Sequence, residues 1–217
     1  MTVVAVAGRS GVGATTVAYN LAAAMGAVVV DADLDLADLP ADRGPDLHDV
    51  LAGRADPVES VRDGGPVPIL PCGRPLDGSR PVDPGQLSAV LARVASAYGG
   101  AVLDAGAPRT ATLPVSAAET CVPVATPTPR ALAVAVALLV RARGRGTGLA
   151  SAVCNRAGTV GAAAVRALGW PVTAVPASDA VVRAARHGLP VAALDPDGPA
   201  AGAFDALAAA VQRSVRS

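Results

Sequence analysis

The residues best suited to chemistry lie near the amino terminus, in a glycine-rich segment that follows a short apolar run. Gly8, Gly11 and Gly13 are spaced so that backbone N–H groups can converge on one anion, and Thr15 follows at the start of an alanine-rich stretch. Glycines permit such a backbone, and the first turn of a helix adds partial positive charge. A threonine hydroxyl at that place can bind Mg²⁺. The spacing therefore predicts a phosphate-binding loop. Its residues are Gly8, Arg9, Ser10, Gly11, Val12, Gly13, Ala14, Thr15 and Thr16.

The loop lacks the residue that normally carries its charge. Gly8, Gly13 and Thr15 match the pattern G-x-x-x-x-G-K-[ST], but Ala14 stands where a lysine would reach the β- and γ-phosphates. The chain contains no lysine, and all 18 basic side chains are arginines. A charge-assisted hydrogen bond contributes about 1.5–3 kcal/mol, so its loss should weaken nucleotide binding about ten- to a hundredfold. Hydrolysis should suffer more, because charge builds up on the phosphate oxygens in the transition state.

Further polar residues stand directly after apolar runs that are predicted to be strands. Asp31 and Asp33 follow one run, Asp104 ends another, and Asn155 with Arg156 follows a third. Carboxylates at strand ends beside a phosphate loop can bind the waters of Mg²⁺ and position a nucleophile. An Asn amide and an Arg plane can together bind a base. The plainer alternatives are a solvated acidic turn for the aspartates of the first run and an ordinary turn residue for Asp104.

Short β-branched runs alternate with alanine-rich stretches along the chain, which is typical of a parallel sheet with crossover helices. Most runs are apolar on both faces, as suits a sheet covered on both sides. We expect an α/β protein with a three-layer P-loop NTPase fold: a mainly parallel sheet of about seven strands with helices on both faces, in a single domain spanning residues 1–217. The predicted strands are 2–7, 27–31, 67–70, 101–104, 121–125, 149–155 and 172–175. The predicted helices are 15–25, 84–97, 128–143, 159–168, 179–187 and 199–213, with stops at Gly26, Gly99, Gly144 and Gly188.

Composition argues against several classes of function. Eighteen acids balance the 18 arginines, and aromatic residues make up 2% of the chain, which argues against DNA as a partner and against base-stacking platforms. Three widely spaced cysteines argue against a disulfide framework or a zinc site and favour a reducing cytoplasm. His48 and His187 belong to no catalytic or metal-spaced set. The apolar stripe at 204–215 is best explained by packing on the sheet, which leaves at most weak, peripheral binding at the inner membrane face.

Residues 8–26, GRSGVGATTVAYNLAAAMG, resemble the deviant phosphate loop of the MinD/ParA-type ATPases, which reads KGGVGKTT and leads into a helix with an Asn-Leu-Ala segment. The resemblance covers nearly the whole chain. It places Arg9 at the signature lysine that reaches across a nucleotide-sandwich dimer, where Arg9 could act like an arginine finger. Ser10 replaces a glycine of the family loop, and Ala14 replaces its second lysine. A GVGATT loop also resembles the TadZ/CpaE branch, whose members localise pilus-assembly machinery.

Other segments match the same family in its own order. DADLDLADL is similar to switch I, which implies that Asp31 lies near the Mg²⁺ shell and that Asp33 orients the attacking water. Asp35 and Asp38 in that segment are interpreted as solvated surface. The strand that ends at Asp104 resembles Walker B and switch II, so Asp104 would bind Mg²⁺ through water. The family has DxPxG or DTPPG there, whereas this chain has Asp-Ala-Gly-Ala-Pro.

The Asn155-Arg156 pair is similar to the residues with which the family recognises adenine, and residues 169–179 resemble its last strand and base-bordering loop. The resemblance implies ATP and Mg²⁺ as cofactors, a nucleotide-dependent homodimer, and a protein partner that the sequence does not identify. We expect a positioning or partitioning switch that binds ATP and hydrolyses it weakly or not at all. The alternative is a nucleotide-free pseudo-ATPase adaptor, for example a TadZ/CpaE-like localisation factor. A ligase or amidotransferase of similar fold ranks last, because its chemistry needs the loop lysine.

Overall fold

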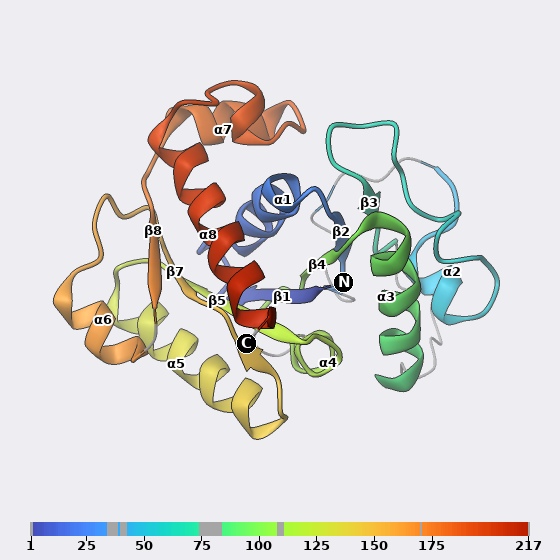
Figure 1. The fold of residues 1–217 in the computed structure, drawn as a ribbon, viewed down its shortest axis with the longest axis horizontal. Helices are drawn as coiled ribbons and strands as arrows, with labels where there is room; N and C mark the ends of the chain where they lie inside the picture. The colour runs from blue at the N-terminus through green and yellow to red at the C-terminus, as the bar shows by residue number, and fades with distance from the viewer. Residues whose placement is uncertain are drawn as a thin grey trace.

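The computed structural model describes residues 2–33, 39, 43–73, 84–107, 111–169 and 171–216 (Figure 1). The described strands are β1 (Val3–Gly8), β2 (Val28–Asp31), β3 (Ile69–Leu70), β4 (Ala101–Asp104), β5 (Thr120–Ala125), β6 (Gly148–Leu149), β7 (Ala152–Asn155) and β8 (Val172–Val175). They form one sheet of order β3-β2-β4-β1-β5-β7-β8, with β6 paired to β5. All pairings between these strands are parallel, which confirms the predicted α/β fold class.

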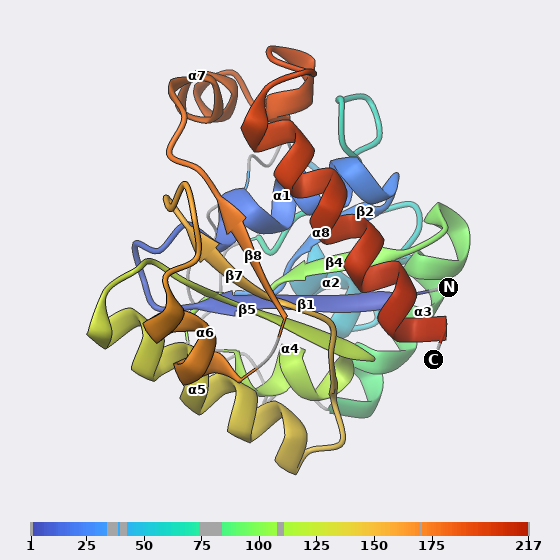
Figure 2. The same ribbon diagram turned by 60° about the vertical axis from the view of Figure 1, so that its left-hand side comes forward.

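Helices cover both faces of the sheet. The described helices are α1 (Ala14–Met25), α2 (Leu47–Leu51), α3 (Pro84–Tyr98), α4 (Thr112–Ala117), α5 (Pro129–Gly144), α6 (Ala162–Leu168), α7 (Asp179–Arg186) and α8 (Pro199–Arg216), with a 3-10 turn at Val191–Ala193. Figure 2 shows α1 and α8 on one side of the sheet and α4 and α5 on the other. Within β1, Val4 and Val6 join the core under α1 and α8, whereas Val3 and Ala5 join the core under α3 and α4. Continuous apolar strands arise because both faces are buried.

The observed elements differ from the predicted ones at a few boundaries. The strand predicted at 149–155 is two strands, β6 and β7, and the hydroxyl of Ser151 between them donates to the carbonyl oxygen of Pro171 at 3.0 Å. Helix α6 begins later than predicted, and the short helix α4 was not expected. Gly144 lies inside α5 rather than after it, and the left-handed glycine there is Gly146, with φ 78°. None of the described helices has the length and apolar character needed to cross a membrane.

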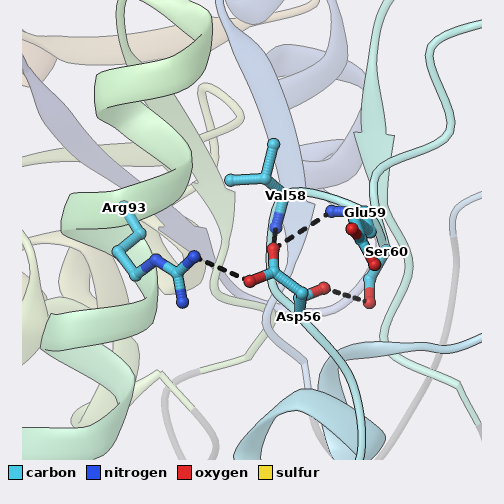
Figure 3. Close-up of polar contacts among 5 residues, drawn as sticks. All are labelled: Asp56, Val58, Glu59, Ser60 and Arg93. Carbon is cyan, nitrogen blue, oxygen red and sulfur yellow. Dashed lines mark hydrogen bonds and ion pairs between the residues drawn. The ribbon is translucent and has the colours of Figure 1, made fainter.

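Figure 3 shows how the segment between α2 and β3 is attached to α3. Oδ1 of Asp56 accepts hydrogen bonds from the N–H groups of Val58 (2.8 Å) and Glu59 (3.3 Å), and the Ser60 hydroxyl donates to the Asp56 carbonyl oxygen. Arg93 on α3 donates to Oδ2 of Asp56 at 2.7 Å. The Val58 hydrogen bond, followed by the Arg93 contact, lowers the pKa of the Asp56 carboxyl. This turn holds the chain that leads into β3 beside the sheet.

Candidate phosphate-binding site

The predicted loop lies at the carboxyl end of β1, in the middle of the sheet. Helix α1 begins directly after it, with Gly13 as the N-cap residue at φ 88° and no side chain capping the first turn. The Val17 N–H donates to the Gly13 carbonyl oxygen at 3.0 Å, which makes the first backbone hydrogen bond of the helix. The first N–H groups of a helix have no partner within the helix and carry partial positive charge. An uncapped first turn therefore offers donors to an anion.

Asn155, at the end of β7, holds this loop from the other side. Its Nδ2 donates to the Val12 carbonyl oxygen at 2.7 Å, and its Oδ1 accepts from the Arg156 N–H at 3.0 Å. A Cβ on Gly13 would lie 2.5 Å from the same Nδ2, so only glycine fits there. The sequence predicted Asn155 as a base-binding residue. The support that it gives to the loop was missed, because a bond across 143 residues leaves no local pattern.

The three predicted aspartates come together beside the loop. Asp31 and Asp104 are direct partners in the register of β2 and β4, and both are fully buried, at 0% and 1% exposure. Asp33 follows two residues after Asp31 and is also buried. Oδ2 of Asp31 accepts a 3.4 Å hydrogen bond from the Leu39 N–H, whereas Oδ1 has no hydrogen-bond partner among the described residues. The edge of the sheet therefore holds concentrated negative potential.

Burial is the main reason why the pKa of Asp31 rises to about 7, and the neighbouring charge of Asp104 raises it further. A cation at this edge would relieve both effects. Among the described residues, no three carboxylate, imidazole or thiol groups are arranged to hold a metal ion by themselves. A metal ion here would therefore need additional oxygen ligands, such as phosphate oxygens and water.

Gly106 connects the loop with two of the aspartates. Its N–H donates to Oδ1 of Asp104 at 3.4 Å, and its carbonyl oxygen accepts from the Gly8 N–H at 3.2 Å. Its φ is 65°, and a Cβ at this position would collide with the Asp33 carboxylate. The turn after β4 departs from the family's DxPxG sequence, and Gly106 is the residue that lets it pass between Asp33 and the loop.

The remaining predicted site residues lie further from the centre. Arg9 and Ser10 are exposed on the outer turn of the loop, where the Arg9 carbonyl oxygen accepts from the Val12 N–H at 3.1 Å. Thr15 and Thr16 are half-buried in the first turn of α1. Arg156 is exposed at the mouth of the site. These residues lie in or near the loop, and their roles stay predictions.

Two groups of contacts around the site were not predicted. The Tyr19 hydroxyl donates to the Gly188 carbonyl oxygen at 2.6 Å, and Oδ1 of Asn20 accepts from the Val191 N–H at 2.7 Å, so α1 is tied to the chain after α7. The Cys72 thiol lies 3.4 Å from the Asp33 carbonyl oxygen and 3.7 Å from Nε2 of His48. His48, expected to be structural, thus lies beside Cys72, which itself contacts Asp33.

A glycine loop at the start of α1 and aspartates at the ends of adjacent parallel strands define a P-loop protein of the nucleotide-binding α/β class. No protein-family model matches the chain. An uncharacterized ATP-binding protein of Methanocaldococcus jannaschii is 30% identical over an alignment of 221 positions, which covers 93% of this chain and 84% of that protein. The chain belongs to the MinD/ParA family of P-loop ATPases.

Solved structures agree with this assignment. The septum site-determining protein MinD of Pyrococcus horikoshii, complexed with Mg-ADP, superposes with a TM-score of 0.84 at 25% identity, covering 99% of this chain and 98% of that one. The cell division ATPase MinD of Pyrococcus furiosus superposes with a TM-score of 0.86 at 24% identity, covering 98% of each chain. At that identity the similarity shows a shared fold.

The raised pKa of Asp31 predicts a pH-dependent stability of the nucleotide-free protein. The folded state holds this proton up to about pH 7, whereas the unfolded chain releases it near pH 3.8. The free energy of unfolding should therefore fall as pH rises from about 4 to about 7, by up to about 4 kcal/mol from this group. Asp31→Asn should remove that part of the slope, and exposed Asp205→Asn should not. Urea denaturation at pH 5 and pH 7.5 without metal checks this, and parallel pH profiles for both variants would contradict it.

Gly106→Ala should destabilise the protein more than Gly99→Ala. Both glycines have positive φ, so both variants pay about 1–2 kcal/mol for a left-handed alanine. Only at position 106 does the new Cβ meet another group, the Asp33 carboxylate. We expect an extra loss of at least about 1 kcal/mol for Gly106→Ala, partly recovered when Asp33→Ala is added. Equal losses of stability for Gly106→Ala and Gly99→Ala in urea denaturation, or no recovery when Asp33→Ala is added, would show that Asp33 and Gly106 are not in close contact.

Proposed function

We propose that this protein is a nucleotide-dependent switch that binds ATP and Mg²⁺ at the 8–16 loop, dimerises in the bound state and then recruits a protein partner. Hydrolysis is weak or absent because Ala14 replaces the loop lysine. One observation carries this proposal: Asp31 and Asp104 are buried side by side at the edge of the sheet that faces an uncapped helix start. A protein that only kept the fold as a scaffold would have no use for two acidic side chains buried side by side.

The residues present fit a magnesium-bound nucleotide. The uncapped first turn of α1 supplies N–H donors for phosphate oxygens, and the Thr15 hydroxyl stands at the start of that turn. The free Oδ1 of Asp31 and the carboxylate of Asp104 would hold water molecules of a Mg²⁺ ion. When bound, Mg²⁺ would neutralise charge on the phosphates and on the aspartates together. The cation would also explain why the protein tolerates a buried acid with a raised pKa.

Side chains of this protein would perform the remaining roles in water positioning, base binding and dimerisation. The Asp33 carboxylate, pressed against Gly106, would orient an attacking water, and Asn155 would keep the loop in its open form while presenting an amide to the base. Arg9 is exposed on the outer turn, which supports a role in which it would reach a second subunit rather than its own loop. Dimerisation through this face would bring each Arg9 to the partner's phosphates, which allows slow turnover despite Ala14.

Calorimetric titration with Mg-ATP tests the proposal. We expect saturable binding by the wild type in the micromolar range. Its affinity for Mg-ATP should be about ten- to a hundredfold lower than that of an Ala14→Lys variant, because the wild type lacks the loop lysine. Adding EDTA should weaken binding further. Gly13→Val, which fills the space occupied by Asn155 Nδ2, should abolish it. No heat for wild type or Ala14→Lys at high micromolar protein would instead favour the nucleotide-free adaptor.

Ala14→Lys should also raise ATPase activity, because the added cation acts on charge that develops in the transition state. We expect an increase of at least about tenfold in phosphate release at saturating Mg-ATP. In the Ala14→Lys background, Asp33→Asn should remove most of this gain without weakening Mg-ATP binding by more than a few fold. An unchanged rate in Ala14→Lys would mean that the rest of the site does not support hydrolysis either.

A further inference from the structure

Because Ala14 replaces the loop lysine, another cation must balance the negative charge at the loop. Asp31, Asp33 and Asp104 gather beside the loop, and a nucleotide would add several more negative charges. Among the described residues that border the loop, two arginines could compensate, Arg9 on its outer turn and Arg156 at the end of β7. The resemblance assigns Arg9 to the partner's site and Arg156 to the adenine base. The geometry of Arg156 indicates a different task.

The Arg156 guanidinium reaches back over the loop. Its Nη2 lies 4.0 Å from the position that a Cβ on Gly13 would take. Gly13 is the N-cap residue of α1 and directly precedes Ala14, the position at which the lysine is missing. The side chain of Arg9 lies farther than this from the same position. Of the two arginines, Arg156 is therefore the nearer to Gly13, the residue that precedes Ala14.

The backbone fixes Arg156 at this place. Arg156 is the only described residue other than glycine with positive φ, at 58°, a conformation that costs a side-chain-bearing residue about 1 kcal/mol or more. Its N–H donates to Oδ1 of Asn155, whose Nδ2 in turn donates to the Val12 carbonyl oxygen. One amide thus holds both the loop and the arginine. If position 156 were only a turn, we would expect glycine or asparagine there, because both adopt positive φ more readily than arginine.

The charge of Arg156 is also available. Its guanidinium has no hydrogen-bond or ion-pair partner among the described residues. A guanidinium offers a planar fork of donors that matches two phosphate oxygens and stays charged at any relevant pH. We propose that Arg156 contacts the phosphate oxygens at the Gly13 end of the loop and supplies the positive charge that Ala14 lacks. This inference rests on the proposed nucleotide binding and names the residue that makes it possible without a lysine.

Inorganic pyrophosphate with Mg²⁺ separates this role from base recognition, because it has phosphates and no base. Arg156→Asn removes the charge while asparagine still tolerates the left-handed backbone. We expect it to weaken both pyrophosphate and ADP binding about ten- to a hundredfold in calorimetry. Arg156→Lys should retain most of the affinity. Arg183→Asn, an exposed arginine on α7, is the matched control and should change neither ligand.

Two further comparisons make the outcome decisive. Arg9→Gln should weaken pyrophosphate binding less than Arg156→Asn does, and Ala14→Lys should restore pyrophosphate binding in the Arg156→Asn background. Unchanged pyrophosphate affinity with reduced ADP affinity in Arg156→Asn would make Arg156 a base-binding residue and overturn the inference. A larger loss in Arg9→Gln would overturn it in favour of Arg9. Wild type that binds neither ligand would contradict the proposed function itself, and with it this inference.

Discussion

Two buried carboxylates on adjacent parallel strands are the constraint on which the site depends. Asp31 and Asp104 are direct partners in the β2–β4 register, and neighbouring strands are only about 4.8 Å apart. Both side chains are shielded from water, so their charges are neither screened nor solvated. The folded protein accommodates them only as a protonated group or with a cation nearby. The proposed cation would stabilise the ionised pair at this edge of the sheet.

The loop, the turn after β4 and the end of β7 form one connected unit around these carboxylates. Gly106 joins the loop at Gly8 to Asp104 and packs against Asp33, while Asn155 ties the loop to β7. Hydrogen bonds from α1 to the chain after α7 extend the unit to the neighbouring segments of the same layer. The proposed nucleotide binding at the loop would therefore also affect Asp33 and the turn after β4. This connection is built from backbone groups and a few side-chain amides.

Much of this site could be predicted from the sequence. The spacing of Gly8, Gly13 and Thr15 and the aspartates after apolar runs correctly indicated a loop and carboxylates at one sheet edge, because parallel strands must end together. Contacts between distant segments could not be predicted. The approach of Gly106 to Asp33, the bond from Asn155 to Val12 and the left-handed backbone of Arg156 depend on tertiary packing. The division of the 149–155 strand into β6 and β7 likewise depends on pairing with β5 and β8, which the local sequence does not show.

The central claim is that the site binds a magnesium-bound nucleotide even though its loop has no lysine. The most direct test is a crystal structure with Mg²⁺ and a non-hydrolysable ATP analogue. The account predicts phosphates in the 8–16 loop, Mg²⁺ at the Thr15 hydroxyl, and metal-bound water between the ion and the carboxylates of Asp31 and Asp104. A structure at saturating ligand in which the loop binds no phosphate, or in which Oδ1 of Asp31 still has no partner beside a bound nucleotide, would contradict it.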